Sequence, residues 1–481
     1  MNRRPALVGA CLALLAACGR SPDKPSVPLA EAPGPARSAP PSSVVRLARA
    51  GGHAAAYTVP GLDTTEWRSE TVVPALDTLV GADFEHHVVL ALDRKHNLIA
   101  LDLNERRSRS LAPQVRGAAI GPDGSVYAAD SGRTVLQLSR RATTRLPGRL
   151  ATLPVAMFGG AGGVALAIEP GHLSILGGDA ERRVAIPRGP VAATFWGDLL
   201  AVGTDSGVVF LDPQGKRSPA RVAESSHTRS LVFSPSGHRL YAAGDGRELL
   251  VIDRFGHSVL KRIALPGAAT ALRVDFFGNW LLARSSAGDS AWVVDLDAER
   301  VVGAVRTPWA GDLPAVAAPR TLVARRDKDI VALDLASPAL PETGRVSGGA
   351  RDIWVAVTWA PTPPAAVSEA TADTARVVAA PRPATPDSAA RGADSTKAGA
   401  AAPAPVLYLQ VSSSRNPTWA DDLAARLRAA GLQPSVLKPA GADETYRVVL
   451  GPFRTRDEAE ETGRRLGMPS FVITAEGDSG R

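Results

Sequence analysis

The middle of the chain repeats one short pattern, an apolar strand of four or five residues that ends in aspartate or another turn-forming residue. Its seven copies are residues 98–102, 135–139, 173–177, 208–212, 249–253, 291–295 and 330–334. The closing residues of successive copies are 37, 38, 35, 41, 42 and 39 positions apart. A period of about 40 residues is typical of a four-stranded propeller blade. The pattern therefore predicts an all-β propeller at residues 44–360, with seven blades as the main count and eight as the alternative.

Turn-forming sequences between the strands support the same fold. Pro122-Asp123-Gly124 and Pro235-Ser236-Gly237 each stand between two apolar runs, as expected for a tight turn between paired strands. Residues 352–359 are expected to complete the last sheet. Residues 44–59 are expected to supply an outer or closing strand, so that both ends of the propeller share a blade. The region resembles WD40- and YVTN-type propellers, although the Trp-Asp dipeptide expected at their blade ends is absent.

The propeller sequence shows no catalytic constellation. His86-His87, with His53 and His96, fits no standard ligand spacing, so no metal site is predicted. The run from 159 to 163 is rich in glycine but leads into a strand and is followed by no lysine, unlike a phosphate-binding loop. The repeated aspartates are expected to cap turns by accepting backbone N–H bonds. Propellers host both enzymes and binding platforms, and these observations favour a platform for protein partners without a cofactor.

A second pattern begins near the C-terminus, at residues 405–476. Residues 407–411 alternate as in a half-buried strand. An amphipathic helix is expected from Pro417, with Asn416 as its N-cap and Gly431 at its end. Short strands at 433–438 and 446–450 follow, then a helix that opens on a capping box at 455–458, and a last strand at 470–474. This β-α-β-β-α-β order predicts a ferredoxin-like α+β domain with both helices on one side of the sheet.

The other side of this sheet is predicted to carry mixed polar, aromatic and cationic side chains. They are Tyr408, Gln410, Thr445, Arg447, Val449 and Val472. Such a set suits a ligand with many hydroxyl and acetamido groups. It also suits an ordinary solvated face of an antiparallel sheet, so the pattern alone leaves both interpretations open.

Three stretches of this domain resemble the SPOR (sporulation-related repeat) domain. They are Leu409-Gln410-Val411 before a serine-rich turn, Tyr446–Phe453 with the sequence YRVVLGPF, and the helical Asp457-Glu458-Ala459-Glu460. The resemblance implies binding of peptidoglycan, preferentially of glycan strands without stem peptides, at division septa. It also implies that the glycan contacts lie on the open sheet face.

Carried over by motif, the peptidoglycan-binding residues are Gln410, Ser413, Thr445, Arg447 and Val472. Two positions depart from the family pattern. Ser412 replaces the usual glycine in a segment that lacks the usual aromatic residue, and Thr445 stands where an aromatic residue often precedes the arginine. These departures imply weaker affinity or a different glycan preference.

The first residues read as a secretory signal. A short basic start precedes an apolar run from Ala6 to Ala17, which is too short for a typical membrane-spanning helix. Leu15-Ala16-Ala17-Cys18 resembles a bacterial lipoprotein lipobox, which implies removal of residues 1–17 and lipidation of Cys18. Gly19 after the cysteine favours the outer membrane by analogy with Gram-negative sorting. The alternative is an ordinary signal peptide cut near Ala17.

Two segments of low complexity separate these parts. Residues 18–43 and 361–404 are rich in Pro, Ala and Ser and poor in large apolar residues, which predicts a tether and a linker without a packed core. Cys11 and Cys18 are the only cysteines, so the rest of the chain has neither a disulfide nor a cysteine metal site. The net charge of +7 is scattered over arginine pairs with no basic stripe, so nucleic-acid binding is not predicted.

Two functional hypotheses follow. The first is a lipid-anchored envelope protein that binds peptidoglycan through the C-terminal domain and uses the propeller as a docking scaffold for a protein partner. The second is a propeller enzyme, a hydrolase or lyase, that the C-terminal domain targets to the cell wall. Acidic or histidine side chains that converge on the central opening of the propeller would favour the second.

Overall fold

The computed structural model describes two parts of the chain, and each is treated by itself. Its described residues are 42–84, 86–139, 142–160, 162–178, 181–224, 227–361, 406–414, 417–429, 431–438, 446–455, 458–459, 462–463 and 471–475. The predicted signal peptide with Cys18, nearly all of the tether and the linker after residue 361 lie outside these residues. None of the described helices is long and apolar enough to cross a bilayer.

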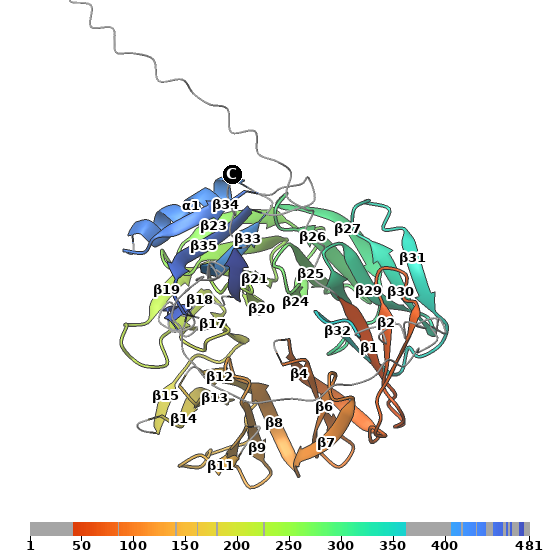
Figure 1. Cartoon of the computed structure of the whole chain (residues 1–481). Coiled ribbons are helices and arrows are strands. Elements are labelled where there is room, and N and C mark those ends of the chain that lie inside the picture. The colour runs from red at the N-terminus through yellow and green to blue at the C-terminus, as the bar shows by residue number, and fades with distance from the viewer. Residues whose placement is uncertain are drawn as a thin grey trace, which may run out of the picture. The chain divides into compact units, whose positions relative to one another are not determined.

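The first part consists of eight four-stranded antiparallel sheets arranged around a centre like the blades of a propeller (Figure 1). The innermost strands are β4 (Leu76–Asp83), β8 (Val115–Ile120), β12 (Ala156–Gly160), β16 (Val191–Ala193), β20 (Thr228–Phe233), β24 (Ala269–Val274), β28 (Ala315–Ala318) and β32 (Ile353–Val357). The second strands are β5 (Val88–Asp93), β9 (Val126–Asp130), β13 (Val164–Glu169), β17 (Leu200–Thr204), β21 (Arg239–Gly244), β25 (Trp280–Ser285), β29 (Thr321–Arg326) and β1 (Ser43–Leu47).

The outer half of each sheet follows the same order. The third strands are β6 (Leu98–Asp102), β10 (Val135–Leu138), β14 (His172–Leu176), β18 (Gly207–Leu211), β22 (Glu248–Asp253), β26 (Ser290–Asp295), β30 (Asp329–Asp334) and β2 (Ala55–Thr58). The outermost strands are β7 (Arg107–Ala112), β11 (Thr143–Arg145), β15 (Arg182–Ala185), β19 (Ala220–Ala223), β23 (Val259–Ala264), β27 (Arg300–Arg306), β31 (Glu342–Val346) and β3 (Thr64–Arg68). Each outermost strand carries an Arg or Lys, which discourages edge-to-edge pairing with another chain.

The count of seven blades was wrong, and the alternative of eight sheets is what the structure shows. The seven repeats found in the sequence are the third strands of seven sheets, from β6 to β30. The eighth third strand is β2, whose sequence Ala-Ala-Tyr-Thr lacks the apolar run that closes on a turn residue. Its sheet therefore left no trace in the repeat pattern.

This eighth sheet joins the two ends of the propeller. Strand β1 pairs antiparallel with β32, from Ser43 opposite Val357 to Leu47 opposite Ile353. The prediction that residues near both ends share a blade is thus confirmed. Three strands come from the start of the region and the innermost one from its end, so the closing hydrogen bonds join segments more than 300 residues apart.

Eight hydrophobic clusters fill the interfaces between neighbouring sheets, one to each interface. Alternate residues of one strand enter different clusters. On β21, Leu240 and Ala242 pack toward the sheet of β16–β19, whereas Tyr241 and Ala243 pack toward the sheet of β24–β27. Because side chains alternate along a strand, each middle strand buries both of its faces. The last two clusters join the shared sheet to β4–β7 and to β28–β31, which closes the ring.

The aspartates that close the repeats cap turns, as predicted. The Asp102 carboxylate accepts the backbone N–H groups of Asn104 and Glu105. Asp212 and Asp295 accept the N–H groups of the turns that follow them in the same way. These side chains stabilise the connection from the third to the outermost strand.

The glycine-rich run leads into a strand, also as predicted, and its first glycine allows two sheets to approach closely. A Cβ atom added to Gly159 would lie 2.3 Å from the Cα of Gly121, in the turn after the neighbouring inner strand. Any larger residue at 159 would force these inner strands apart, so the glycines serve packing here.

The second part is a four-stranded antiparallel sheet with the strand order β34-β35-β33-β36. Its elements are β33 (Val406–Ser414), α1 (Pro417–Ala429), β34 (Pro434–Leu437), β35 (Tyr446–Phe453) and β36 (Phe471–Ala475). Residues 458–459 and 462–463 are helical. This is the predicted order of elements, with two strands longer than expected.

The ends of the helices follow the predicted chemistry where they are described. Helix α1 begins at Pro417, and Gly431 follows it at φ 82°, a left-handed conformation that favours glycine. The Thr455 hydroxyl accepts the N–H of Glu458, and the Glu458 carboxylate accepts the N–H of Arg454. This reciprocal capping starts the second helical segment.

Candidate functional site

The sheet of the second part has one side covered by α1. Leu409, Val411, Val448 and Leu450 pack there against helix residues that include Leu423 and Leu427. The opposite side is called the helix-free face below. Gln410 lies opposite Val449 in the register of β33 and β35, at a position between those of the helix-covered residues. Both residues therefore occupy the helix-free face, as the alternation of the sequence predicts.

A β-bulge brings Ser413 to the same face. The register of β33 against β35 shifts between Gln410 and Ser412, so that Val411 and Ser412 together oppose Val448. A strand without this extra residue would place positions 410 and 412 on one face and position 413 on the other. With the bulge, Ser413 lies opposite Arg447 and shares the helix-free face with Gln410. Three of the predicted site positions, 410, 413 and 447, are thereby brought together.

Val472 differs from the prediction. Strand β36 pairs with β33 so that Val472 lies opposite Leu409, a position of the helix-covered side. The positions on the helix-free face are instead Phe471 opposite Gln410 and Ile473 opposite Tyr408. The sequence could not show which of these residues face the helix, because residues 471–473 are all apolar. Either alternation would place an apolar residue on the helix-covered side. Phe471 and Ile473 are thus the positions of β36 on the helix-free face, which sequence reasoning missed.

The remaining predicted site residue, Thr445, lies outside the described residues. The side chains of Gln410 and Arg447 are both half-buried. A guanidinium supplies five N–H donors and an amide supplies both donors and an acceptor. Together they can bind neutral, oxygen-rich groups such as hydroxyls and acetamido carbonyls without needing a charged ligand. The glycan-binding roles of these residues remain predictions.

Residues 404–474 match the family model of the SPOR domain. The SPOR domain thus covers the described second part of the chain up to residue 474. It implies peptidoglycan binding and a place in the periplasm or cell envelope. The helix-free face of this SPOR domain is the face on which the predicted glycan contacts at 410, 413 and 447 meet.

Comparison with solved structures concerns the propeller-like part. The crystal structure of Citrobacter koseri AztD is 12% identical in sequence, with a TM-score of 0.49. The alignment covers 66% of this chain and 98% of the AztD chain. The structure of dihydro-heme d1 dehydrogenase NirN in complex with DHE is 16% identical, covers 67% of this chain and 77% of its own, and has a TM-score of 0.48. No curated protein matches the chain.

Three of the four histidines that the sequence analysis considered have hydrogen-bond partners for their rings. The Nδ1 atom of His86 lies 2.7 Å from Asp83 Oδ2, and that of His53 lies 2.7 Å from the Ser69 carbonyl oxygen. His87 Nδ1 lies 3.1 Å from the Asn104 amide nitrogen. Among the described residues, no group of three or more His, Cys, Asp or Glu side chains could hold a metal ion.

A buried acid lies at the end of one inner strand of the propeller-like ring. Asp275 follows inner strand β24 and is 5% exposed. Its two carboxylate oxygens accept the N–H groups of Phe277 at 3.1 Å and Trp280 at 2.7 Å. Burial nevertheless raises the pKa of Asp275 to about 6. The carboxyl holds the turn between β24 and β25, and its charge varies with pH.

This raised pKa predicts a pH-dependent stability. Between about pH 4 and pH 6, folded Asp275 keeps a proton that the unfolded chain has released, so its stabilising contribution is full below pH 4 and is lost as pH rises through 6. In Asp275→Asn this loss should be absent. The free energy of unfolding of the wild type, relative to that of the variant, should fall as pH rises from 4 to 7, by an amount on the order of 3 kcal/mol, and the melting temperatures of the two proteins should follow it. If the difference in melting temperature between the wild type and the variant stays constant from pH 4 to pH 7, the pKa of Asp275 is not raised.

Proposed function

We propose that the protein is a lipid-anchored protein of the cell envelope that binds peptidoglycan through its SPOR domain, with the propeller-like ring as a scaffold for a protein partner. The observation that carries the proposal is the bulge at Val411, which brings positions 410, 413 and 447 onto the helix-free face. The proposed ligand is the glycan strand without stem peptides, as found at division septa.

The ends of the chain suit this role. The lipobox-like sequence before Cys18 supports an anchor, and Gly19 supports the outer membrane. Several acyl chains hold a protein at a membrane stably, where one chain is marginal. A protein held at the membrane and connected to its wall-binding domain by a linker keeps that domain at a high local concentration near the wall. Weaker glycan affinity, one of the two outcomes that the departures at 412 and 445 imply, would then be sufficient.

Sedimentation with purified sacculi tests the proposal. The full chain is mixed with sacculi that are untreated or treated with an amidase to strip stem peptides, and the bound fraction is measured after pelleting. We expect more protein to be retained on the treated sacculi, because the bare glycan presents its hydroxyl and acetamido groups without the peptides. Absence of retention on both would overturn the wall-binding role.

A further inference from the structure

Aromatic residues gather at one end of the propeller-like ring. Within a sheet the first and third strands run in the same direction, so the loops that follow them lie at the same end. Five of the ten phenylalanines of the chain lie in these loops. They are Phe84 after β4, Phe195 between β16 and β17, Phe255 between β22 and β23, and Phe276 and Phe277 between β24 and β25. The other end of the ring has no comparable set among its described loops.

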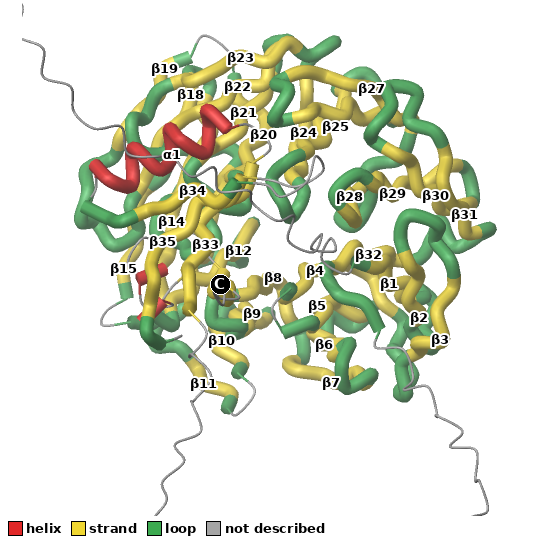
Figure 2. The backbone as a smooth tube through the Cα atoms, turned by 45° about the horizontal axis from the view of Figure 1, so that its top comes forward, coloured by secondary structure: helices red, strands yellow, loops and turns green. Residues whose placement is uncertain are grey.

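Two of these rings meet across the centre. Phe84 and Phe276 follow inner strands whose sheets are separated in the ring by two others, those of β28 and β32. Their ring centroids nevertheless lie 4.9 Å apart, at an interplanar angle of 59°. Phe277 adds a third ring, perpendicular to Phe276 with centroids 5.4 Å apart. An aromatic contact therefore joins the loops that follow β4 and β24 at this end of the ring, and Figure 2 shows these two strands.

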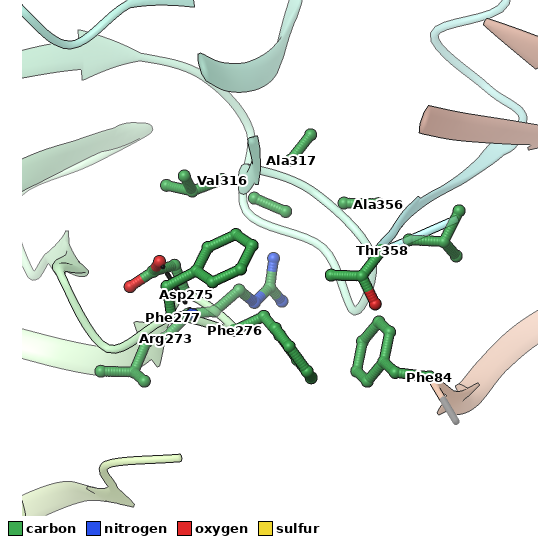
Figure 3. A pocket seen from close by; sticks show the side chains of 12 residues that line it. Phe84, Arg273, Asp275, Phe276, Phe277, Val316, Ala317, Ala356 and Thr358 are labelled. Carbon is green, nitrogen blue, oxygen red and sulfur yellow. Dashed lines mark hydrogen bonds between the residues drawn. The ribbon is translucent and has the colours of Figure 1, made fainter. Parts of the chain in front are cut away.

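A pocket of about 150 Å³ lies beside these rings. Its remaining wall comes from the small apolar residues of β28 and from the end of β32, and Figure 3 shows Phe84, Phe276 and Thr358 around the same space. The apolar lining consists of Phe84, Val274, Phe276, Phe277, Ala315, Val316, Ala317, Ala356 and Val357.

The polar lining residues are mostly engaged by the fold. The Arg273 guanidinium donates to the carbonyl oxygens of Pro314 at 2.5 Å and Ala310 at 2.8 Å. The Asp275 carboxylate accepts two backbone N–H groups and is directed away from Phe84 (Figure 3). The Thr358 hydroxyl is the remaining polar side chain of the lining. The pocket thus offers a mainly apolar space, in which Thr358 supplies a hydroxyl and the other polar side chains are bonded within the fold.

This chemistry discriminates between ligands. A sugar ring would bury many hydroxyls against few hydrogen-bonding groups that the fold leaves available, which is unfavourable because each unpaired polar group loses its bonds to water. An aromatic ring carries no hydroxyl groups that burial would leave unpaired, and it packs favourably edge-to-face on phenylalanine. An apolar cavity of about 150 Å³ is large enough to hold benzene. We propose that this pocket is a binding site for one uncharged aromatic ring, carried by a small molecule or by a side chain of a polypeptide.

The site is independent of wall binding by the SPOR domain, so it is tested separately. The purified full chain is titrated with phenol, indole and N-acetylphenylalaninamide, with N-acetylglucosamine as the sugar control, and binding is followed by ligand-observed NMR. We expect saturable binding of the aromatic probes to the full chain, with one site per chain. The sugar control is titrated into the full-length double variant Gln410→Ala/Arg447→Ala, whose glycan-binding positions are removed, and we expect it not to bind. Tighter binding of N-acetylphenylalaninamide than of phenol and indole would identify a polypeptide as the source of the ring, and the reverse order a small molecule.

Variants locate the binding. Ala356→Leu places a larger side chain in the pocket and should weaken the binding of the aromatic probes at least tenfold. Phe276→Ala removes a half-buried ring from the pocket wall and should also weaken binding of these probes, which keeps the test valid if Ala356→Leu does not fold. The matched control is Phe195→Leu, a loss of a 53% exposed phenylalanine at the same end but outside the pocket, which should leave binding unchanged. The proposal is overturned if the folded wild type binds no aromatic probe, or if both pocket variants bind the probes as tightly as the wild type.

Discussion

Asp312→Ala should lower the free energy of unfolding of the propeller-like ring by about 3–5 kcal/mol, because it leaves a buried charge without its partner. The side chains of Arg325 and Asp312 are only 8% and 4% exposed. They form two parallel bonds, from the guanidinium nitrogens to the two carboxylate oxygens, of 3.0 and 2.6 Å. Asp312 also accepts the N–H of Trp354, on the strand β32 that closes the ring. The variant therefore removes bonds that hold the closing strand to its neighbouring sheet.

The measurement is thermal or urea unfolding of the full chain followed by tryptophan fluorescence. The matched control is Glu70→Gln, which breaks an ion pair with Arg107 whose side chains are 68% (Arg107) and 49% (Glu70) exposed. An exposed pair contributes only about 0–1 kcal/mol. If Asp312→Ala costs no more than Glu70→Gln, the buried pair is not what holds the closure.

The double variant Gln410→Ala/Arg447→Ala should reduce binding to amidase-treated sacculi by at least about tenfold. A hydrogen bond to a charged group contributes roughly 1.5–3 kcal/mol, and 1.4 kcal/mol is a tenfold change in affinity. Both positions lie on the helix-free face, on the adjacent strands β33 and β35. The dissociation constant is obtained by sedimentation over a range of sacculus concentrations.

Arg428→Ala is the matched control for this experiment. Arg428 is an exposed arginine of α1, on the side of the sheet opposite the helix-free face. It removes the same charge from the same domain and should retain wild-type binding. If both variants bind equally weakly, the general positive charge of the domain accounts for the binding and the face does not.

Local pattern was sufficient for much of the SPOR domain. The order of its elements, the start of α1 at Pro417, its end before Gly431 and the capping pair Thr455 and Glu458 all follow from short-range chemistry. Each of these features depends on residues within a few positions of one another. The face of β36 does not, because its alternation is set by hydrogen bonds to β33 and leaves Val472 opposite Leu409.

The sequence by itself determined the period of the repeat, and with it the all-β class of the first part, because strand length, burial and turn chemistry are written locally in each blade. Only the tertiary structure decided the number of sheets, since the eighth sheet forms when β1 pairs with β32, more than 300 residues away in the chain. Only the tertiary structure, likewise, decided that a bulge at Val411 carries Ser413 to the face of Gln410, and that Phe84 meets Phe276 across the ring. Pairing partners and register depend on contacts between distant segments, and such contacts leave no mark in the pattern of any single strand.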